Sequence, residues 1–339
     1  MKQLPIYALF ALLISSLVFW GIVLSDKKTT PKALGKKSIA SVSVILPPDR
    51  TTLLFAGDIM LDRGVEYQIK QNGGNWNWPF LLIKDFLSEA DLVFGNLESQ
   101  ISDKGERMGS IYSFRADPKS LEGLTYAGFN VLSVANNHSF DYGVQAFKDS
   151  LKRLDDTGIA TVGGGLNKKE AHTPTFKHYH TSKYDSTTIG ILAYTAVGSP
   201  NWQATSNIPG ISWVDPFNID EVLAEIEQGA AQTDLLVVSI HAGEEYKTEP
   251  NSFQQAFARS AIDSGADLVI GHHPHVVQPV ERYKEGWIAY SLGNFIFDQG
   301  FSAETMQGLL LKVEIEDSLI YSVTSIPTRL TKDFQVFIP

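Results

Sequence analysis

Carboxylate, amide and imidazole side chains recur at one kind of position in this sequence, directly after short apolar runs. Six runs end in this way: Leu53–Ala56, Leu92–Phe94, Val131–Val134, Leu235–Ile240, Leu268–Ile270 and Ile288–Leu292. The polar residues at or just after their ends are Asp58, Asn96, Glu98, Asn136, Asn137, His138, His241, His272, His273, His275 and Asn294. The chain contains no cysteine, and such oxygen and nitrogen donors are ligands for Mn²⁺, Fe²⁺/Fe³⁺ or Zn²⁺, or for Mg²⁺ where fewer histidines take part.

A cluster of these groups would support phosphoryl or acyl hydrolysis. Two cations about 3.5–4 Å apart can activate a water and stabilise both oxygens of an in-line displacement. A nearby histidine that binds no cation can protonate the leaving oxygen. The segment 271–275, with three histidines in four residues, has few structural uses and indicates metal binding or catalysis.

Single residues of this set also have structural interpretations. Asp58 could cap a helix, and Asn136 and Asn137 are common in turns. A lone histidine after an apolar strand, such as His241, is more often a hydrogen-bonded core residue than a ligand. The recurrence of the pattern along one chain is what favours a single convergent cluster.

The apolar runs themselves have the length and composition of buried β-strands. Helical patterns lie between them, at Pro79–Ser88, Pro118–Ala127, Val144–Asp156, Asn218–Ala231 and Ser252–Ser264. This alternation predicts an α/β domain with a mostly parallel sheet, while segments 307–314, 319–326 and 334–338 predict further, antiparallel strands. Functional sites of open α/β sheets lie outside the carboxyl ends of the strands, where the polar residues are expected to meet.

The N-terminal part of the 339-residue chain differs from the rest. Residues 4–24 carry no charge, and as a helix they would be about 30 Å long, enough to cross a bilayer. The run exceeds the roughly 7–15 apolar residues of a signal-peptide core, and no clear Ala-x-Ala site follows it. We therefore predict a membrane anchor in residues 1–25 in preference to a cleaved signal, a linker in residues 26–50 and a folded domain in residues 51–339.

Charge is distributed unevenly along the chain. Residues 1–48 hold six lysines and one aspartate, and the remaining 291 residues hold 22 basic and 37 acidic groups. So acidic a domain argues against nucleic-acid binding. The five lysines within 13 residues after the apolar segment would keep that side in the cytoplasm by the positive-inside rule. We expect an extracytoplasmic domain, anchored or secreted after cleavage, and this orientation has no support from that rule.

Other residues with functional potential are expected to be structural. His172, His178 and His180 lie in a polar stretch and are expected at the surface. Trp76 and Trp78 are expected to anchor a buried loop in preference to lining a sugar or peptide groove. The pattern N-W-N-W around them is by itself weak evidence for binding.

Six motifs resemble, in order, those of the bacterial capsule synthesis protein CapA family. They are GDIMLDR (57–63), GNLESQIS (95–102), NNHSFDYG (136–143), HAGEEY (241–246), GHHPHVVQP (271–279) and SLGNFIFDQ (291–299). The resemblance covers about residues 51–300, and the family is associated with poly-γ-glutamate synthesis and export. It belongs to the calcineurin-like metallophosphoesterase superfamily, which implies a two-sheet sandwich flanked by helices (α/β/β/α) and a dinuclear metal site.

The resemblance also implies a role for each residue. Asn137, His241 and His272 would hold one cation, and Asp58, Glu98 and His275 would hold the other. His138 would be the general acid. His138 and Asp141 are the candidate catalytic residues. The positions that would support the ligands or contact substrate are Asn96, Asn136, Glu244, His273 and Asn294.

Two positions depart from the superfamily pattern. Metallophosphoesterases begin with Asp-x-His, and here Met60 stands where the histidine belongs. Their second motif is Gly-Asp, and here Asn96 follows Gly95, with Glu98 as a substitute carboxylate. A thioether is a poor ligand for hard cations, so one or two bound metals, and hydrolysis itself, stay open.

Together these features predict a CapA-like protein that acts in synthesis, export or attachment of a surface polymer such as poly-γ-glutamate, through a metal-dependent hydrolase-type site. Expected partners are the membrane, a polymer synthase complex and an anionic polymer or phosphoester substrate. A polyanion would be repelled by the acidic domain unless a metal or a local basic patch offsets the field. Two alternatives stay open: a non-catalytic accessory subunit of a membrane synthase, and an extracytoplasmic metallophosphoesterase unrelated to capsule.

Overall fold

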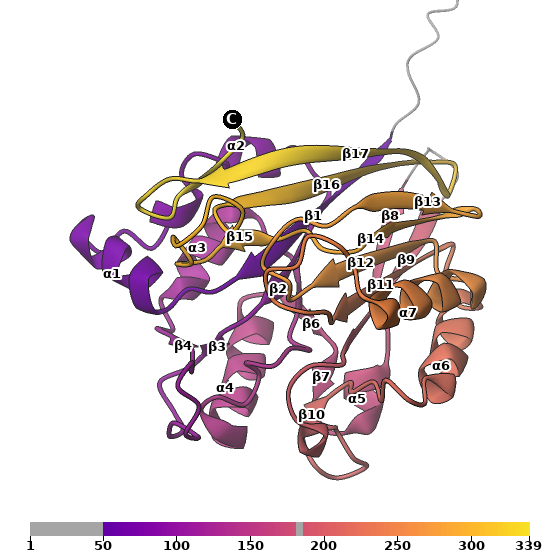
Figure 1. Ribbon diagram of the computed structural model, residues 1–339, viewed down its shortest axis with the longest axis horizontal. Helices are drawn as coiled ribbons and strands as arrows, with labels where there is room; N and C mark the ends of the chain where they lie inside the picture. Colours follow the sequence, from indigo (N-terminus) through magenta and orange to yellow (C-terminus); the bar gives the residue numbers. More distant parts are fainter. Residues whose placement is uncertain (1–49, 181–185) are drawn as a thin grey trace, which may run out of the picture. The chain divides into compact units, whose positions relative to one another are not determined.

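A computed structural model describes residues 50–180 and 186–339 of the chain, so the predicted anchor (residues 1–25) and nearly all of the predicted linker (residues 26–50) lie outside the described residues. The described part is a mixed α/β fold dominated by two large sheets (Figure 1). Within these described ranges, no helix is long and apolar enough to cross a membrane.

The first sheet has the strand order β18-β17-β16-β1-β2-β5-β6, and β15 pairs with the end of β1. Its strands are β1 (Thr51–Ile59), β2 (Leu92–Leu97), β5 (Val131–Ser133), β6 (Ala160–Val162), β15 (Asn294–Ile296), β16 (Gln307–Glu316), β17 (Leu319–Leu330) and β18 (Val336–Phe337). Strands β1, β2, β5 and β6 are parallel, whereas β16, β17 and β18 add to β1 in antiparallel fashion. The antiparallel strands predicted near the C-terminus are therefore confirmed.

The second sheet has the order β13-β14-β12-β11-β9-β8. Its strands are β8 (Thr175–His180), β9 (Ser186–Thr195), β11 (Leu235–His241), β12 (Leu268–His272), β13 (Val280–Tyr283) and β14 (Gly286–Ala289). The inner strands β9, β11, β12 and β14 are parallel, and antiparallel strands close both edges. Short ladders join β3 (Gln100–Ile101) to β4 (Arg115–Ala116) and β7 (Gly164–Gly165) to β10 (Gly210–Ile211).

Helices follow most of the predicted segments. They are α1 (Arg63–Gln71), α2 (Lys84–Leu87), α3 (Ser120–Ala127), α4 (Gly143–Asp156), α5 (Lys168–His172), α6 (Asp220–Ala230) and α7 (Ser252–Asp263), with 3-10 turns η1 (Trp78–Phe80) and η2 (Pro200–Trp202). The single helix predicted for Pro79–Ser88 is wrong, because the segment forms η1 and then the one-turn helix α2. Phe80 and Ile83 turn into the core there, while Leu82 between them is exposed.

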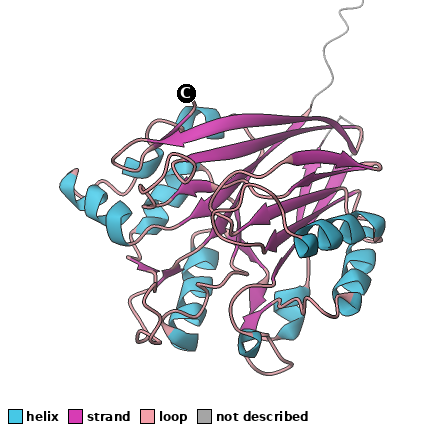
Figure 2. Cartoon of the chain, in the orientation of Figure 1, coloured by secondary structure: helices cyan, strands magenta, loops and turns pink. Residues whose placement is uncertain are grey.

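Alternate residues of the central strands pack into different cores. Phe55 of β1 and Val237 of β11 share the core between the two sheets, whereas Leu54 packs against helices on the opposite face of the first sheet. Val238 of β11 packs with Phe257 of α7 on the outer face of the second sheet. Helices thus cover the outer face of each sheet (Figure 2). Burial on both faces explains why these strands are continuously apolar.

Two glycines bring the segment between β14 and β15 against the ends of β1 and β12. A Cβ at Gly57 would lie 1.9 Å from the carbonyl oxygen of Gly293, and one at Gly271 would lie 1.9 Å from that of Tyr290. The backbone N–H that follows Gly57 donates to Gly293 at 3.0 Å, and Leu292 donates to Gly271 at 3.2 Å. This segment therefore fixes the carboxyl ends of one strand from each sheet relative to one another.

The residues expected to be structural have mixed outcomes. The surface prediction for His172 is wrong, because α5 docks with its Ala171 buried and places the His172 ring, 7% exposed, 2.8 Å from Glu225 Oε2. His178 is exposed as predicted, and the side chain of His180 lies outside the described residues. The loop-anchor prediction is confirmed: Trp76 is buried, and Trp78 Nε1 donates to the Asp333 carbonyl at 3.3 Å.

Asp149 of α4 is expected to make the stability of this fold depend on pH. Burial alone would raise the pKa of Asp149, but hydrogen bonds from Lys104, Arg153 and Ser102 at 2.5–2.7 Å lower it to about 2. A depressed folded-state pKa gives stability that is present above the unfolded value of 3.8 and is lost as the pH falls toward 2. Asp149→Asn is therefore expected to lower the free energy of unfolding by about 1.5–3 kcal/mol at pH 7 and by much less near pH 2.5.

Urea unfolding at pH 7, 5 and 2.5 measures this difference. Asp156→Asn is the matched control, because Asp156 lies on the same helix, is exposed and pairs only with Lys152 of its own helix among the ion pairs of the described residues. An equal loss for Asp149→Asn at pH 7 and pH 2.5 would contradict the expectation.

Candidate metal centre

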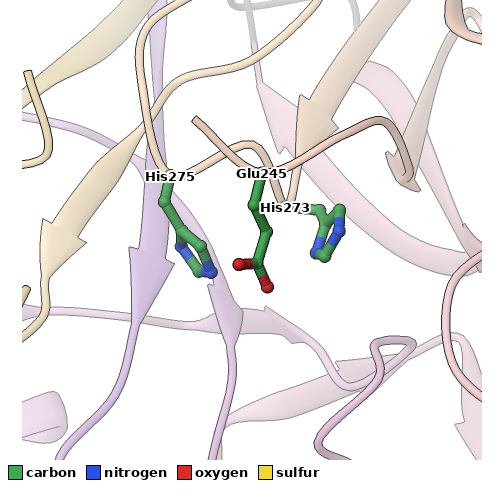
Figure 3. Close-up of side chains that lie close together, drawn as sticks. All are labelled: Glu245, His273 and His275. Atoms are coloured by element: carbon green, nitrogen blue, oxygen red, sulfur yellow. The ribbon is translucent and has the colours of Figure 1, made fainter. Parts of the chain in front are cut away.

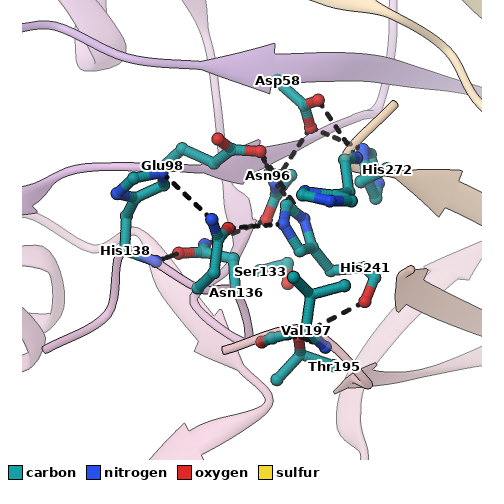
Figure 4. A network of polar contacts seen from close by, with 12 residues as sticks. Asp58, Asn96, Glu98, Ser133, Asn136, His138, Thr195, Val197, His241 and His272 are labelled. Carbon is teal, nitrogen blue, oxygen red and sulfur yellow. Dashed lines mark hydrogen bonds and ion pairs between the residues drawn. The ribbon is translucent and has the colours of Figure 1, made fainter. Parts of the chain in front are cut away.

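Strand ends from both sheets meet in one buried polar cluster (Figure 4). Asp58 lies near the end of β1, and Asn96 lies in β2 with Glu98 just after it. His241 is the last residue of β11, and His272 is the last residue of β12. Each of these five side chains is at most 1% exposed. The parallel pairing of β1 with β2 and of β11 with β12 places their carboxyl ends at the same edge of each sheet.

Asp58 is held as a carboxylate by its neighbours. His272 Nδ1 lies 3.2 Å from Asp58 Oδ1, His275 Nδ1 lies 3.4 Å from Oδ2, and the backbone N–H of His273 donates to Oδ2 at 3.2 Å. Burial alone would raise the pKa of Asp58, but the imidazoles of His272 and His275 hold it well below its usual value. The site therefore contains a buried anion.

Glu98 has the opposite electrostatic balance. Burial, followed by the negative charge of Asp58, raises the pKa of Glu98 well above its usual value. Its Oε1 lies 3.5 Å from His241 Nδ1, and its Oε2 lies 3.9 Å from His275 Nε2. Oε2 is buried and accepts no hydrogen bond from any described residue. Among the ion pairs of the described residues, this carboxyl group contacts only the imidazoles of His241 and His275.

The amide of Asn96 occupies the point where three of these groups converge. Its Nδ2 lies 2.9 Å from Asp58 Oδ1, 3.1 Å from Glu98 Oε1 and 3.1 Å from His241 Nδ1. One amide nitrogen has two hydrogens for these three acceptors. Asn136 Nδ2 donates to Asn96 Oδ1 at 3.1 Å and to the backbone carbonyl that follows Asn96 at 2.8 Å, which fixes the orientation of the amide.

A chain of hydrogen bonds links the cluster to His138. His241 Nε2 donates to Asn137 Oδ1 at 2.8 Å, and Asn137 Nδ2 donates to His138 Nε2 at 3.2 Å. Asp141 Oδ2 accepts from His138 Nδ1 at 2.7 Å, and the ring of Phe114 lies against the imidazole with centroids 4.1 Å apart. The ring of His138 is therefore fixed, with Nε2 directed to the cluster side.

The remaining sequence-derived residues fall into two groups. Asn294 Oδ1 lies 3.0 Å from His275 Nδ1 and so orients that ring. Glu244, in contrast, is exposed and lines a shallow hollow together with Lys247. Its neighbour Glu245 lies beside His273 and His275 instead (Figure 3). The motif HAGEEY contains both glutamates, and nothing in its spacing tells which of them faces the histidines.

Met60 offers no ligand to the cluster. Its side chain is buried, and its sulfur accepts a hydrogen bond from the backbone N–H of Asp62 at 3.1 Å. The superfamily pattern has a histidine at this position. Here the position holds a thioether that is hydrogen-bonded to the backbone two residues later in the chain.

The donor atoms present fit a divalent cation. Both ring nitrogens of His272 and Nδ1 of His273 are buried and make no hydrogen bond within residues 50–180 and 186–339; the 3.2 Å contact of His272 with Asp58 lacks hydrogen-bond geometry. Each such unpaired group costs about 1–3 kcal/mol. Burial lowers the pKa of His241 well below its usual value and that of His273 to about 3, which keeps both imidazoles in the neutral form that binds metals.

The sequence matches the model of a family described as "Bacterial capsule synthesis protein PGA_cap" over residues 52–299. "PGA biosynthesis protein CapA" of Bacillus subtilis is 35% identical over 250 residues, which are 73% of this chain and 63% of the relative. "Capsule biosynthesis protein CapA" of Bacillus anthracis is 32% identical over 278 residues, 80% of this chain and 65% of the relative. The chain thus spans less than two thirds of the length of each. A Mycoplasma pneumoniae phosphatase structure covers 83% of this chain and 94% of its own at 18% identity, with a TM-score of 0.48.

Proposed function

Because the chain belongs to the bacterial capsule synthesis family PGA_cap, we propose that it acts in synthesis, export or attachment of a capsule polymer such as poly-γ-glutamate. Within this role we propose cation-dependent hydrolysis of a phosphoester or amide bond. The observation that supports it is the buried cluster of Asp58, Glu98, His241 and His272, which has more donor atoms than hydrogen-bond partners.

These four residues would hold the cation, whose identity we place among Mn, Fe and Zn. A cation bound there would supply a Lewis acid that polarises a phosphoryl or carbonyl oxygen. Asn137 would orient His241 through its 2.8 Å hydrogen bond, and Asn96 would hold Asp58 and Glu98 at a fixed separation.

His138 would supply the proton for the leaving group. Asp141 accepts a hydrogen bond from the Nδ1–H of His138 and stabilises the imidazolium form, as a carboxylate does in other acid–base pairs. In the imidazolium form Nε2 carries a proton in place of the hydrogen bond from Asn137, and it would give this proton to the leaving oxygen or nitrogen. Phe114 keeps the ring in place and excludes water from one of its faces.

The proposal also includes the fold of the domain and its location in the cell. We propose an α/β/β/α sandwich of the metallophosphoesterase kind, supported by the core between the two sheets and the helices on both outer faces. We also propose that residues 1–25 anchor an extracytoplasmic domain beside a polymer synthase, or are removed to release it. The uncharged segment 4–24 supports this part.

A non-catalytic accessory subunit is the second candidate, and Asn96 favours it. The Asn96 amide already bridges Asp58, Glu98 and His241, and Met60 replaces a histidine of the superfamily pattern. In this interpretation the cluster joins the two sheets, and the domain serves a membrane synthase as a scaffold.

A His272→Ala variant in cells distinguishes the two candidates. In capsule-producing cells that lack their own CapA, the full chain is expected to restore surface polymer, and His272→Ala is expected to restore less than a tenth of it. The reason is that His272 offers two unpaired ring nitrogens to the cluster. Surface polymer is measured beside an immunoblot of the protein, and His178→Ala, at an exposed histidine of β8, is the matched control.

Two results would count against the proposal. Full restoration by His272→Ala at equal protein level would exclude the hydrolytic site and favour the accessory subunit. Failure of the wild-type chain to restore polymer, with measurable phosphoester turnover in vitro, would favour a phosphoesterase unrelated to capsule.

A further inference from the structure

Arg63 and Asp298 form an ion pair that the proposed reaction does not use. They lie in two of the motifs that the sequence analysis identified, residues 57–63 and 291–299. Nη2 of Arg63 donates to Asp298 Oδ1, and Asp298 Oδ2 accepts from the backbone N–H of Gly64 at 2.9 Å. The carboxylate of Asp298 therefore fixes both the guanidinium of Arg63 and the start of α1.

The backbone at Arg63 is held in a sparsely populated conformation. Its φ angle is 50°, in the left-handed region that residues other than glycine rarely adopt. The next residue must be small, because a Cβ at Gly64 would lie 2.8 Å from the Cβ of Asp298. Strained residues persist only where the surrounding structure enforces them, and they cluster at functional sites. The strain at Arg63 is thus a first indication that the direction of its side chain matters.

One aromatic ring separates Arg63 from His138, the proposed proton donor. The guanidinium carbon of Arg63 lies 4.5 Å from the centroid of the Phe114 ring, and the centroids of Phe114 and His138 are 4.1 Å apart. Phe114 also packs edge-to-face against Phe297, whose ring centroid lies 4.8 Å from that of His275. Arg63 therefore lies next to the groups that would act on a substrate.

Exposed aromatic side chains also lie near Arg63. Burial, followed by the negative charge of Glu245, raises the pKa of Tyr246 above its usual value, and the positive charge of Arg63 acts in the opposite direction. The rings of Tyr246 and Phe301 pack edge-to-face with centroids 5.2 Å apart, and these residues are 44% and 66% exposed. Tyr112, which is also exposed, is close enough to affect the same pKa. Aromatic residues exposed together are typical of binding surfaces.

The guanidinium of Arg63 has donors that the protein does not use. Nη1 and Nε have no hydrogen-bond partner within residues 50–180 and 186–339. Nε is buried, whereas the side chain as a whole is 33% exposed, so a ligand can reach the group from the Nη1 side. A planar guanidinium that is fixed by Asp298 and by the ring of Phe114, with donors left over, is prearranged to bind an anion.

We propose that Arg63 binds a carboxylate of the substrate and so selects the substrate that reaches His138. The ligand is a γ-linked glutamyl chain, in which each amide nitrogen is bonded to a carbon atom that carries a free α-carboxylate. Arg63 supplies one positive charge and already contacts Asp298, so a singly charged carboxylate suits it better than a doubly charged phosphate. The methylene groups of the chain would pack against Tyr246 and Phe301. This inference rests on the proposed function for the identity of the polymer and not for its hydrolysis.

Binding of a short γ-linked glutamate oligomer to the full-length, metal-free protein tests this assignment by titration calorimetry. Arg63→Gln is expected to bind the oligomer at least about tenfold more weakly than the wild-type chain, because a charge-assisted hydrogen bond is lost. An oligomer whose α-carboxylates are amidated is expected to bind weakly and equally to both proteins. Arg282→Gln is the matched control and is expected to bind as the wild-type chain does, because Arg282 is an exposed arginine of β13 that pairs with Glu285.

Asp298→Asn separates ligand binding from a purely structural ion pair. Asparagine has the shape of aspartate but lacks the charge that competes for the guanidinium, so this variant is expected to bind the oligomer at least as tightly as the wild-type chain. Equal weakening in Arg63→Gln and Asp298→Asn would show that the ion pair is structural and would overturn the inference. Binding of phenyl phosphate in place of the oligomer, lost in Arg63→Gln, would overturn the carboxylate assignment.

The outcomes are distinct from those of the proposed function. Undiminished binding of the oligomer by Arg63→Gln, with an unchanged thermal unfolding midpoint, would overturn this inference and leave the role in capsule formation in place. Full restoration of surface polymer by His272→Ala would instead remove the proposed hydrolysis, and carboxylate binding by Arg63 would stand. No binding of the oligomer by the wild-type chain would overturn the inference and count against poly-γ-glutamate as the polymer.

Discussion

Glu98→Gln is expected to stabilise the cation-free protein and to remove most of the stabilisation that a bound cation gives. Glu98 is fully buried beside the carboxylate of Asp58, and its Oε2 has no hydrogen-bond partner within residues 50–180 and 186–339. Burial and the charge of Asp58 both disfavour ionised Glu98, which is why its pKa is raised. Glutamine has the same shape and keeps the acceptor at Oε1 for Asn96, but it carries no charge.

The expected gain is about 1–3 kcal/mol in the free energy of unfolding without added metal, because the uncharged amide is not repelled by the carboxylate of Asp58 and brings no charge into the buried cluster. Added Mn²⁺ is expected to remove this difference in stability or to reverse it. A ligand at 100 times its Kd stabilises a protein by about 2.7 kcal/mol, and the wild-type chain is expected to gain about this much. The variant, which has lost a ligand, is expected to gain little.

Thermal and urea unfolding, each with chelator and with Mn²⁺, measure both effects. Glu244→Gln serves as a control with the same chemical change at an exposed position. If Glu98→Gln is less stable than the wild-type chain in chelator, Glu98 is a structural residue. If both proteins gain equally from Mn²⁺, Glu98 does not bind the cation.

His138→Ala is expected to lower the turnover of the proposed hydrolytic reaction by about 10²–10⁴-fold, the usual contribution of a positioned general acid. The ring of His138 is hydrogen-bonded to Asp141 at 2.7 Å and is linked to the cluster through Asn137, without contacting Asp58 or Glu98 in the described hydrogen bonds. The His138→Ala variant is therefore expected to keep the bound cation. Loss of turnover with unchanged metal content is the result that identifies a proton donor.

Turnover is measured with bis-p-nitrophenyl phosphate and with short γ-glutamyl peptides as probes. Asp141→Asn is the companion variant, because asparagine keeps the contact at Oδ but cannot stabilise the imidazolium. Asp141→Asn is expected to lower turnover, but less than His138→Ala does. Unchanged turnover in both variants would show that His138 takes no part in the reaction.

The sequence predicts the strand ends of this site because buried parallel strands can be recognised in it as short apolar runs. Asp58, His241 and His272 each follow such a run, and each lies at the end of a central strand. The helices α4 and α7 were also predictable, because their amphipathic patterns extend over 14 and 12 residues. The segment that forms η1 and α2 was not, since two short turns share one apolar pattern and only tertiary packing separates them.

Contacts between side chains could not be predicted in the same way. The choice between Glu244 and Glu245 depends on a turn at Gly243, whose φ is 118°, and on the strained backbone after it. The burial of His172 depends on Glu225 of another helix, 53 residues away. The order of the motifs predicts neither the position of Glu245 nor the contact of His172 with Glu225. Both depend on how segments far apart in the sequence pack together in the folded chain.

The buried cluster draws on both ends of the domain, and this determines when a cation could be bound. The backbone N–H of His273 donates to Asp58, 215 residues earlier in the chain, and the segment between β14 and β15 locks the two strand ends together. No nascent fragment that stops before β12 contains a complete set of donors. A cation that binds this cluster would therefore be taken up late in folding, in the compartment where the last strands pair.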